Sequence, residues 1–179
     1  MLTFLTDEEL SKHKEYHERL RHACSLTEKR TGITLFGGVD EYSCHEKLWY
    51  RASRRLNGEE LELFGLERLH SVYFHSFCAG SFQQSTAVRE LFGSESSLLH
   101  RLFIEGMKLG CGFVGLLNTK RGITVFAERD AKTVMSRGTP LLAIDLYEHA
   151  YYGDYSFDKE SYLKTALSHL RLSAIDEYS

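Results

Sequence analysis

The first strong pattern along the chain is helical. Thr6 is followed three residues later by Glu9, which is the spacing of a capping box at the start of a helix. Apolar and imidazole side chains then recur every three or four residues, at Leu10, His13, His17, Leu20 and Cys24. This pattern predicts a long helix that carries two histidines on its inward face and ends near Thr31-Gly32.

Further helical patterns follow after an irregular stretch. Residues 33–58 have no clear period, although Lys47–Leu56 favours a short helix. A second long helix is expected over Glu59–Ala79, with its apolar side at Leu63, Leu66, Val72 and Tyr73. Val88–Phe92 indicates a helical turn closed by Gly93, and Ser94 can cap a helix that continues to Leu109.

The pattern changes in the second half of the chain. Three short apolar and β-branched runs, Gly112–Leu117, Ile123–Phe126 and Leu141–Leu146, predict strands of one sheet, and a last helix is expected over Lys159–Leu172. The fold class is therefore α+β, an N-terminal long-helix hairpin followed by a small three-stranded antiparallel sheet flanked by helices. We expect a helical hairpin lobe over 1–87 and an α/β lobe over 88–179.

Composition and charge narrow the class of protein. The 179 residues are 42% apolar, which suffices for a core, and the formal net charge of −3 argues against a nucleic-acid-binding surface. The sequence contains no 18-residue apolar stretch, so no membrane span is expected. The N-terminus does not resemble a signal peptide, and the four cysteines form no Cys-x-x-Cys pair. We therefore expect reduced cysteines and a cytoplasmic location.

Candidate chemistry concentrates at Asp145-Leu146-Tyr147-Glu148-His149-Ala150-Tyr151-Tyr152. This segment places a carboxylate and an imidazole four positions apart, directly after a buried apolar run. Carboxylate and imidazole ligands suit iron or manganese, and His13 and His75 are candidates for two more. Glu67-x-x-His70 has the spacing of a di-iron bundle, but a second copy of that motif is absent from the sequence.

Several motifs in this order resemble the iron/manganese superoxide dismutase family. They are the Asp145–Tyr152 string, His13-x-x-x-His17, His75-Ser76-Phe77, Phe92-Gly93-Ser94, Gly110-Cys111-Gly112-Phe113 and Thr139-Pro140-Leu141-Leu142. The resemblance extends over residues 6–24, 66–79 and 88–172. It implies one iron or manganese ion per subunit, between the two lobes, bound by His13, His75, Asp145 and His149.

The resemblance also implies a homodimer. Glu148 would reach across the interface to His149 of the partner subunit, and Tyr152 would hydrogen-bond His17 near the same interface. His17, Arg21 and Tyr152 are then the residues expected around the mouth of the site. The implied activity is the disproportionation of superoxide to dioxygen and hydrogen peroxide.

The chain departs from the family around the metal. The family's active-site tyrosine, eight residues after the first ligand, falls on Arg21, whose charge could instead steer an anion. The glutamine that hydrogen-bonds the bound solvent falls on Ser71, or near Arg129 or Asp130, and His70 is a possible replacement. These differences leave two alternatives open: a metal-binding relative with altered redox activity, and a non-catalytic scaffold on the same fold.

Overall fold

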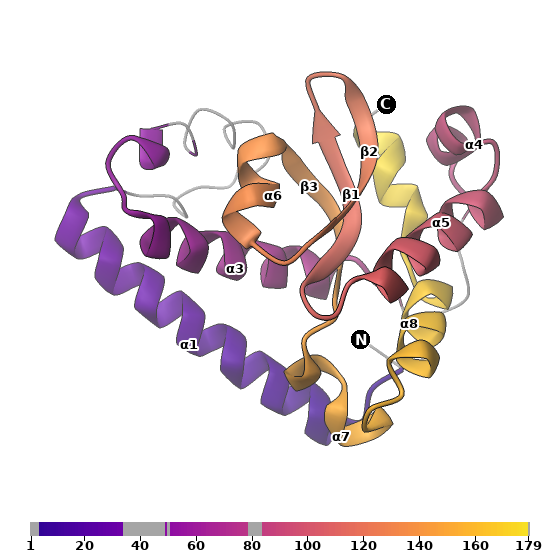
Figure 1. Ribbon diagram of the computed structural model, residues 1–179, viewed down its shortest axis with the longest axis horizontal. Helices are drawn as coiled ribbons and strands as arrows, with labels where there is room; N and C mark the ends of the chain where they lie inside the picture. Colours follow the sequence, from indigo (N-terminus) through magenta and orange to yellow (C-terminus); the bar gives the residue numbers. More distant parts are fainter. Residues whose placement is uncertain (1–3, 34–48, 50, 79–83, 179) are drawn as a thin grey trace.

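The computed structural model describes residues 4–33, 49, 51–78 and 84–178 (Figure 1). It confirms the expected α+β fold, with long helices first and a three-stranded antiparallel sheet after them. Part of the short helix expected over Lys47–Leu56 and most of the irregular stretch before it lie outside the described residues. Among the described residues, none of the helices is both long and apolar enough to cross a membrane.

The two long helices, α1 (Asp7–Thr31) and α3 (Gly58–His75), pack against each other along one side of the molecule. The Thr6 side chain caps α1 by accepting a hydrogen bond from the backbone of Glu9, and Gly32 ends it at a φ of 67°. A capping box formed by Asn57 and Glu60 starts α3. The second helix ends at His75, four residues before Ala79, with Ser76 as its cap and the Ser76 N–H bonded to the carbonyl oxygen of Tyr73.

The sheet is formed by β1 (Phe113–Thr119), β2 (Gly122–Glu128) and β3 (Thr139–Asp145) in the order β2-β1-β3. A helix that the sequence pattern did not indicate, α6 (Ala131–Arg137), joins the two edge strands. The remaining helical segments are α4 (Thr86–Phe92), α5 (Glu95–Lys108), η1 (Glu148–Ala150), α7 (Tyr152–Tyr155), α8 (Lys159–Ser168) and η2 (Leu172–Tyr178). The last predicted helix is therefore shorter than expected.

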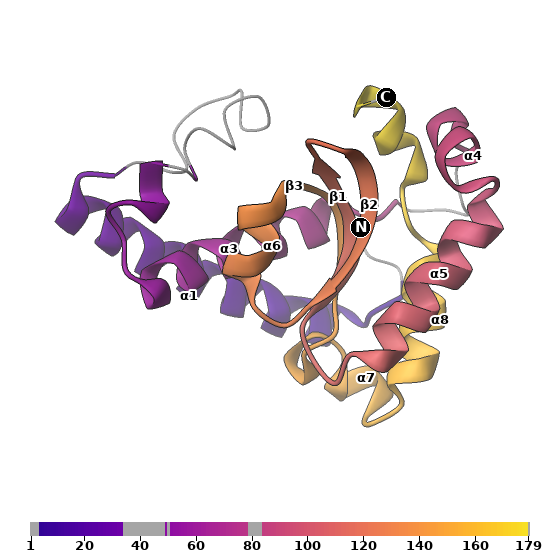
Figure 2. The same ribbon diagram turned by 45° about the horizontal axis from the view of Figure 1, so that its top comes forward.

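Alternation along β1 determines how the sheet is buried. Phe113 and Leu117 face a cluster that includes Leu69 of α3 and Val134 of α6. The side chains between them, such as Leu116, join the main core with the residues of α5 and α8. Figure 2 shows the resulting layers, with α3 and α6 on one side of the sheet and α5 and α8 on the other. This packing brings the end of β3 against α1 and α3.

Candidate metal centre

Four side chains from four different elements converge at the end of β3. His13 comes from α1, His70 from α3, Asp145 is the last residue of β3, and His149 lies in η1. One ligand atom from each of these residues lies within 4.8 Å of the others. The first two belong to the predicted helical lobe and the last two to the predicted α/β lobe, although the boundary between the lobes stays a prediction.

The Asp145 carboxylate is the centre of this cluster. Its Oδ2 lies 3.2 Å from His13 Nε2, 3.1 Å from His70 Nε2 and 3.2 Å from His149 Nε2. Its other oxygen, Oδ1, accepts a hydrogen bond of 2.8 Å from the backbone N–H of Tyr147. That bond fixes the carboxylate so that Oδ2 faces the three imidazoles.

The hydrogen bonds of His70 determine which of its nitrogens is free to bind a metal. Its Nδ1 lies 2.7 Å from the carbonyl oxygen of Leu66. Because a carbonyl oxygen can only accept, Nδ1 carries the proton in this contact. In the neutral imidazole the lone pair is therefore on Nε2, which lies 3.2 Å from His149 Nε2. The hydrogen bond from Nδ1 to the Leu66 carbonyl is of the kind that orients a ligating imidazole and raises its basicity.

Charge in the cluster follows from burial and from the facing imidazoles. Burial opposes ionisation of Asp145, but His13, His149 and His70 outweigh it and hold the pKa of this carboxyl well below its usual range. Burial lowers the pKa of His13, although Asp145 opposes that effect. Burial also opposes the charge on His70, but Asp145 prevails and raises the pKa of this imidazole. The cluster therefore contains a carboxylate anion among imidazoles.

Buried atoms without hydrogen-bond partners are a second reason why the four side chains fit a metal ion. Within the described part of the chain, both ring nitrogens of His13 and Oδ2 of Asp145 are buried with no hydrogen-bond partner. Leaving a buried polar atom unsatisfied costs about 1–3 kcal/mol. A cation among His13 Nε2, Asp145 Oδ2 and the other two Nε2 atoms would satisfy the inward-facing atoms together. Three imidazoles and one carboxylate are ligands that iron and manganese accept.

The cluster contains His70 and not His75, which the sequence reasoning had expected there. His75 is exposed, and its Nδ1 contacts the carbonyl oxygen of Ser71 at 2.7 Å. Five residues along a helix correspond to a rotation of about 140°, so His75 points away from the direction of His70. The inward spacing of Leu66, Leu69 and Tyr73 was the available signal, because it brackets His70 and not His75.

A buried carboxylate contacts two of the three residues expected at the mouth of the site. Glu67 Oε1 lies 3.3 Å from His17 Nε2 and 3.6 Å from Arg21 Nε, and it accepts a hydrogen bond from the Ser71 hydroxyl. The His17 ring stacks on His70 with the ring centroids 6.0 Å apart. The structure thus places His17 beside the cluster, while the Arg21 side chain is 68% exposed.

The residues expected at the dimer interface lie near the surface. Glu148 is exposed, and Tyr152 is 47% exposed with its ring against Phe157. Within the described single chain, Tyr152 makes no hydrogen bond to His17, whose partners are Glu67 and Ser71. The cross-subunit contacts of Glu148 and Tyr152 therefore stay predictions.

Two aromatic rings lie against His149, those of Tyr16 and Tyr147, and the sequence reasoning had not assigned Tyr16 to the site. The centroid of the Tyr16 ring is 4.3 Å from that of His149 and 5.4 Å from that of His70. The Tyr147 ring stacks on His149 at 5.8 Å, and its hydroxyl donates to the carbonyl oxygen of Arg129. Tyr16 could have been found from the sequence, because it lies one helical turn after His13.

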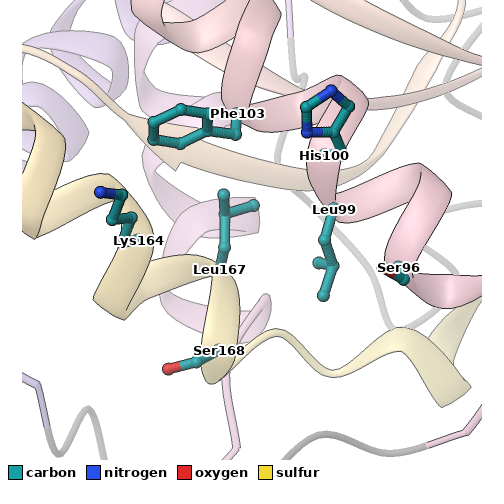
Figure 3. A pocket seen from close by; sticks show the side chains of 7 residues that line it. All are labelled: Ser96, Leu99, His100, Phe103, Lys164, Leu167 and Ser168. Carbon is teal, nitrogen blue, oxygen red and sulfur yellow. The ribbon is translucent and has the colours of Figure 1, made fainter.

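A separate hollow lies between α5 and α8, away from this chemistry. It has a volume of about 390 Å³ and contains none of the four clustered residues. Figure 3 shows its apolar side chains, with Lys164 and His100 at the sides. The Lys164 ammonium lies 5.7 Å from the centre of the Phe103 ring and also pairs with Glu160. This hollow offers no converging set of metal donors.

Fold and cluster together define a metal-binding α+β protein with a buried three-histidine, one-aspartate donor set. Residues 81–177 match the model of the C-terminal domain of iron/manganese superoxide dismutases. The chain therefore belongs to the iron/manganese superoxide dismutase family, whose members bind one iron or manganese ion.

Curated relatives agree with this assignment. The chain is 32% identical over 126 residues to "Superoxide dismutase [Fe]" of Cupriavidus metallidurans, an alignment that covers 64% of each chain. It is 39% identical over 83 residues to "Superoxide dismutase [Mn] 3.3, mitochondrial" of Zea mays, covering 43% of this chain and 36% of that protein. These alignments thus span less than two thirds of the length of either relative.

Proposed function

We propose that the protein is a superoxide dismutase. It would convert two superoxide anions and two protons into one dioxygen and one hydrogen peroxide at a single iron or manganese ion. The observation that carries this proposal is the convergence of His13, His70, Asp145 and His149 on one point between α1, α3 and β3. The bound metal would supply the one-electron exchange.

The residues of this chain would perform the remaining tasks. Asp145 contributes the negative charge that favours a cation, and the tautomer of His70 presents Nε2 as a ligand. The side chains of His13, His70 and Asp145 are fully buried, which excludes bulk water from most of the cluster. The His149 side chain is 30% exposed, so a small anion would approach from its side.

Metal analysis followed by a dismutase assay tests this proposal. The purified protein should contain about one iron or manganese ion per chain and suppress cytochrome c reduction by superoxide. His149→Ala should lose both metal and activity, because it removes one donor. His100→Ala is the matched control, since His100 is exposed on α5, outside the cluster. A metal-loaded wild-type protein with no activity above that of free metal would contradict the proposal.

Two observations favour a second function, a metal-binding relative with altered redox activity. With His70 as the ligand, the position four residues before it is Leu66, an apolar side chain that cannot hydrogen-bond bound solvent. Arg21 occupies the position expected for a tyrosine and pairs with Glu67. A midpoint potential outside the range between the two half-reactions of superoxide, together with stoichiometric metal, would favour this alternative.

We also propose a homodimer formed around His149. Glu148 and Tyr152 are exposed beside the half-buried imidazole, so a second copy could approach them. Sedimentation of the wild-type protein should give a dimer, and Glu148→Ala should weaken it. Glu90→Ala on α4, another exposed glutamate, should not change the mass. A wild-type monomer at micromolar concentration would contradict the proposed dimer.

A further inference from the structure

Among the four clustered side chains, only that of His149 is partly open to solvent. The side chains of His13, His70 and Asp145 are fully buried, whereas that of His149 is 30% exposed. In the isolated chain, a small anion would therefore approach the proposed metal beside the His149 ring. The groups that line this side decide how such an anion is held.

Tyr16 lies on this open side. It follows His13 by one turn of α1, and its half-buried ring contacts both His149 and His70. No hydrogen-bond partner is found for its hydroxyl among the described residues, which leaves this O–H available as a donor. A phenol O–H is a good donor to an anion and carries no charge of its own.

The other polar side chains around the cluster are already engaged. The Tyr147 hydroxyl donates to the Arg129 carbonyl, and the Ser71 hydroxyl donates to Glu67. The fully buried Tyr73 hydroxyl contacts that of Tyr162.

The two basic groups on this side of α1 are also engaged. His17 Nε2 lies between Ser71 and Glu67, and Arg21 pairs with Glu67 as well. Tyr16 is therefore the one hydroxyl in ring contact with the ligands that remains uncommitted within the described part of the chain.

We propose that Tyr16 is an anion-binding residue of this site, whose hydroxyl donates a hydrogen bond to the superoxide held beside His149. This inference rests on the proposed metal centre, and it adds a residue that the sequence patterns did not indicate. The ring of Tyr16 would position the hydroxyl through its contacts with His149 and His70. The hydroxyl would supply the hydrogen bond, so the two contributions can be separated by mutation.

Azide, a small anion that does not turn over, is the probe. Tyr16→Phe keeps the ring and removes the hydroxyl. Titration of the metal-loaded protein with azide, followed by absorption, should show a dissociation constant about tenfold higher than that of the wild type. Metal content should be unchanged, and KM for superoxide should rise more than kcat falls.

Tyr155→Phe is the matched control. It makes the same chemical change at a hydroxyl that donates to the backbone of Phe4, and it should leave azide affinity unchanged. Tyr16→Leu provides a second variant, which removes the ring as well. It should weaken azide binding at least as much as Tyr16→Phe.

The outcomes separate this inference from the proposed function. Equal azide affinity in the wild type and Tyr16→Phe would overturn the role of Tyr16, as would a wild type that binds no azide. A change in oligomeric state with unchanged azide affinity would do the same. Weaker azide binding in Tyr16→Phe, with no dismutase activity in the wild type, would support Tyr16 and contradict the proposed reaction.

Discussion

The choice between His70 and His75 gives the sharpest test of the metal centre. We compare His70→Gln with His75→Gln, which make the same chemical change five residues apart on α3. His70 has Nε2 directed into the cluster, while His75 is exposed and contacts only the carbonyl of Ser71 among the described residues. A bound metal stabilises the folded chain, so the thermal shift on adding metal reports the affinity of the site.

The size of the shift follows from the length of the chain. A ligand at a free concentration a thousand times its Kd stabilises the fold by about 4.1 kcal/mol. With an unfolding entropy of about 2.1 cal/mol/K per residue, a chain of 179 residues gains about 11 °C in Tm. If loss of one ligand weakens binding about a hundredfold, the same metal concentration gives only about 1.4 kcal/mol, or about 4 °C.

The assay is differential scanning fluorimetry of the metal-free proteins with and without manganese, together with metal content after dialysis. We expect His75→Gln to retain the full shift of the wild type and His70→Gln to lose most of it. Equal shifts in the two variants, or a loss confined to His75→Gln, would refute the placement of His70 in the cluster. The metal-free Tm values show whether either substitution disturbs the fold by itself.

Three further predictions concern the fold around the site. Asp145 has a folded-state pKa well below its unfolded value, so its contribution to stability is complete above about pH 4 and is lost as the pH falls further. In a plot of the unfolding free energy of the metal-free protein against pH, Asp145→Asn should therefore reduce the slope below about pH 4. Gly65→Ala should lower the free energy of unfolding, measured with urea, by about 1–3 kcal/mol, because its new methyl would lie 2.8 Å from the backbone of Ala131. Gly58→Ala is the control: among the described residues outside its own helix, its methyl would have no neighbour within 4 Å, so the free energy of unfolding should not fall. Burial raises the pKa of the Cys24 thiol to about 12, so mass spectrometry should find it unmodified by iodoacetamide at pH 8 until the protein unfolds; rapid alkylation in the native state would contradict its burial.

Local patterns in the sequence were sufficient for much of the fold. The Thr6 cap and the end of the first helix at Gly32 follow from contacts within a few residues, and both are seen in the structure. Helix α6 was missed because its seven residues are too short to establish a period, and its burial depends on packing against Gly65 of α3. Tertiary contact, and not propensity, accounts for that helix.

The parts of the site that could be predicted are those whose residues lie close together in the sequence. Asp145 and His149 lie on one short segment, so their proximity depends on only four residues of backbone. The partners of His17 could not be read from the chain, because Glu67 meets it through the packing of α1 on α3. The same packing decides that Arg21 pairs with Glu67, and no motif in the sequence encodes that contact.

The selection of His70 over His75 depends on the rotational phase of a helix. Leu69 and Tyr73 are fully buried on either side of His70, which fixes the inward direction of α3 at that turn. His75 lies two residues beyond Tyr73 and is therefore rotated by about 200° from it, toward solvent. Phe74 and Phe77 flank His75 in the sequence, but aromatic neighbours do not bury a helical residue, because consecutive residues on a helix face different directions. The phase of the apolar positions is thus a better guide to a helical metal ligand than the identity of its neighbours.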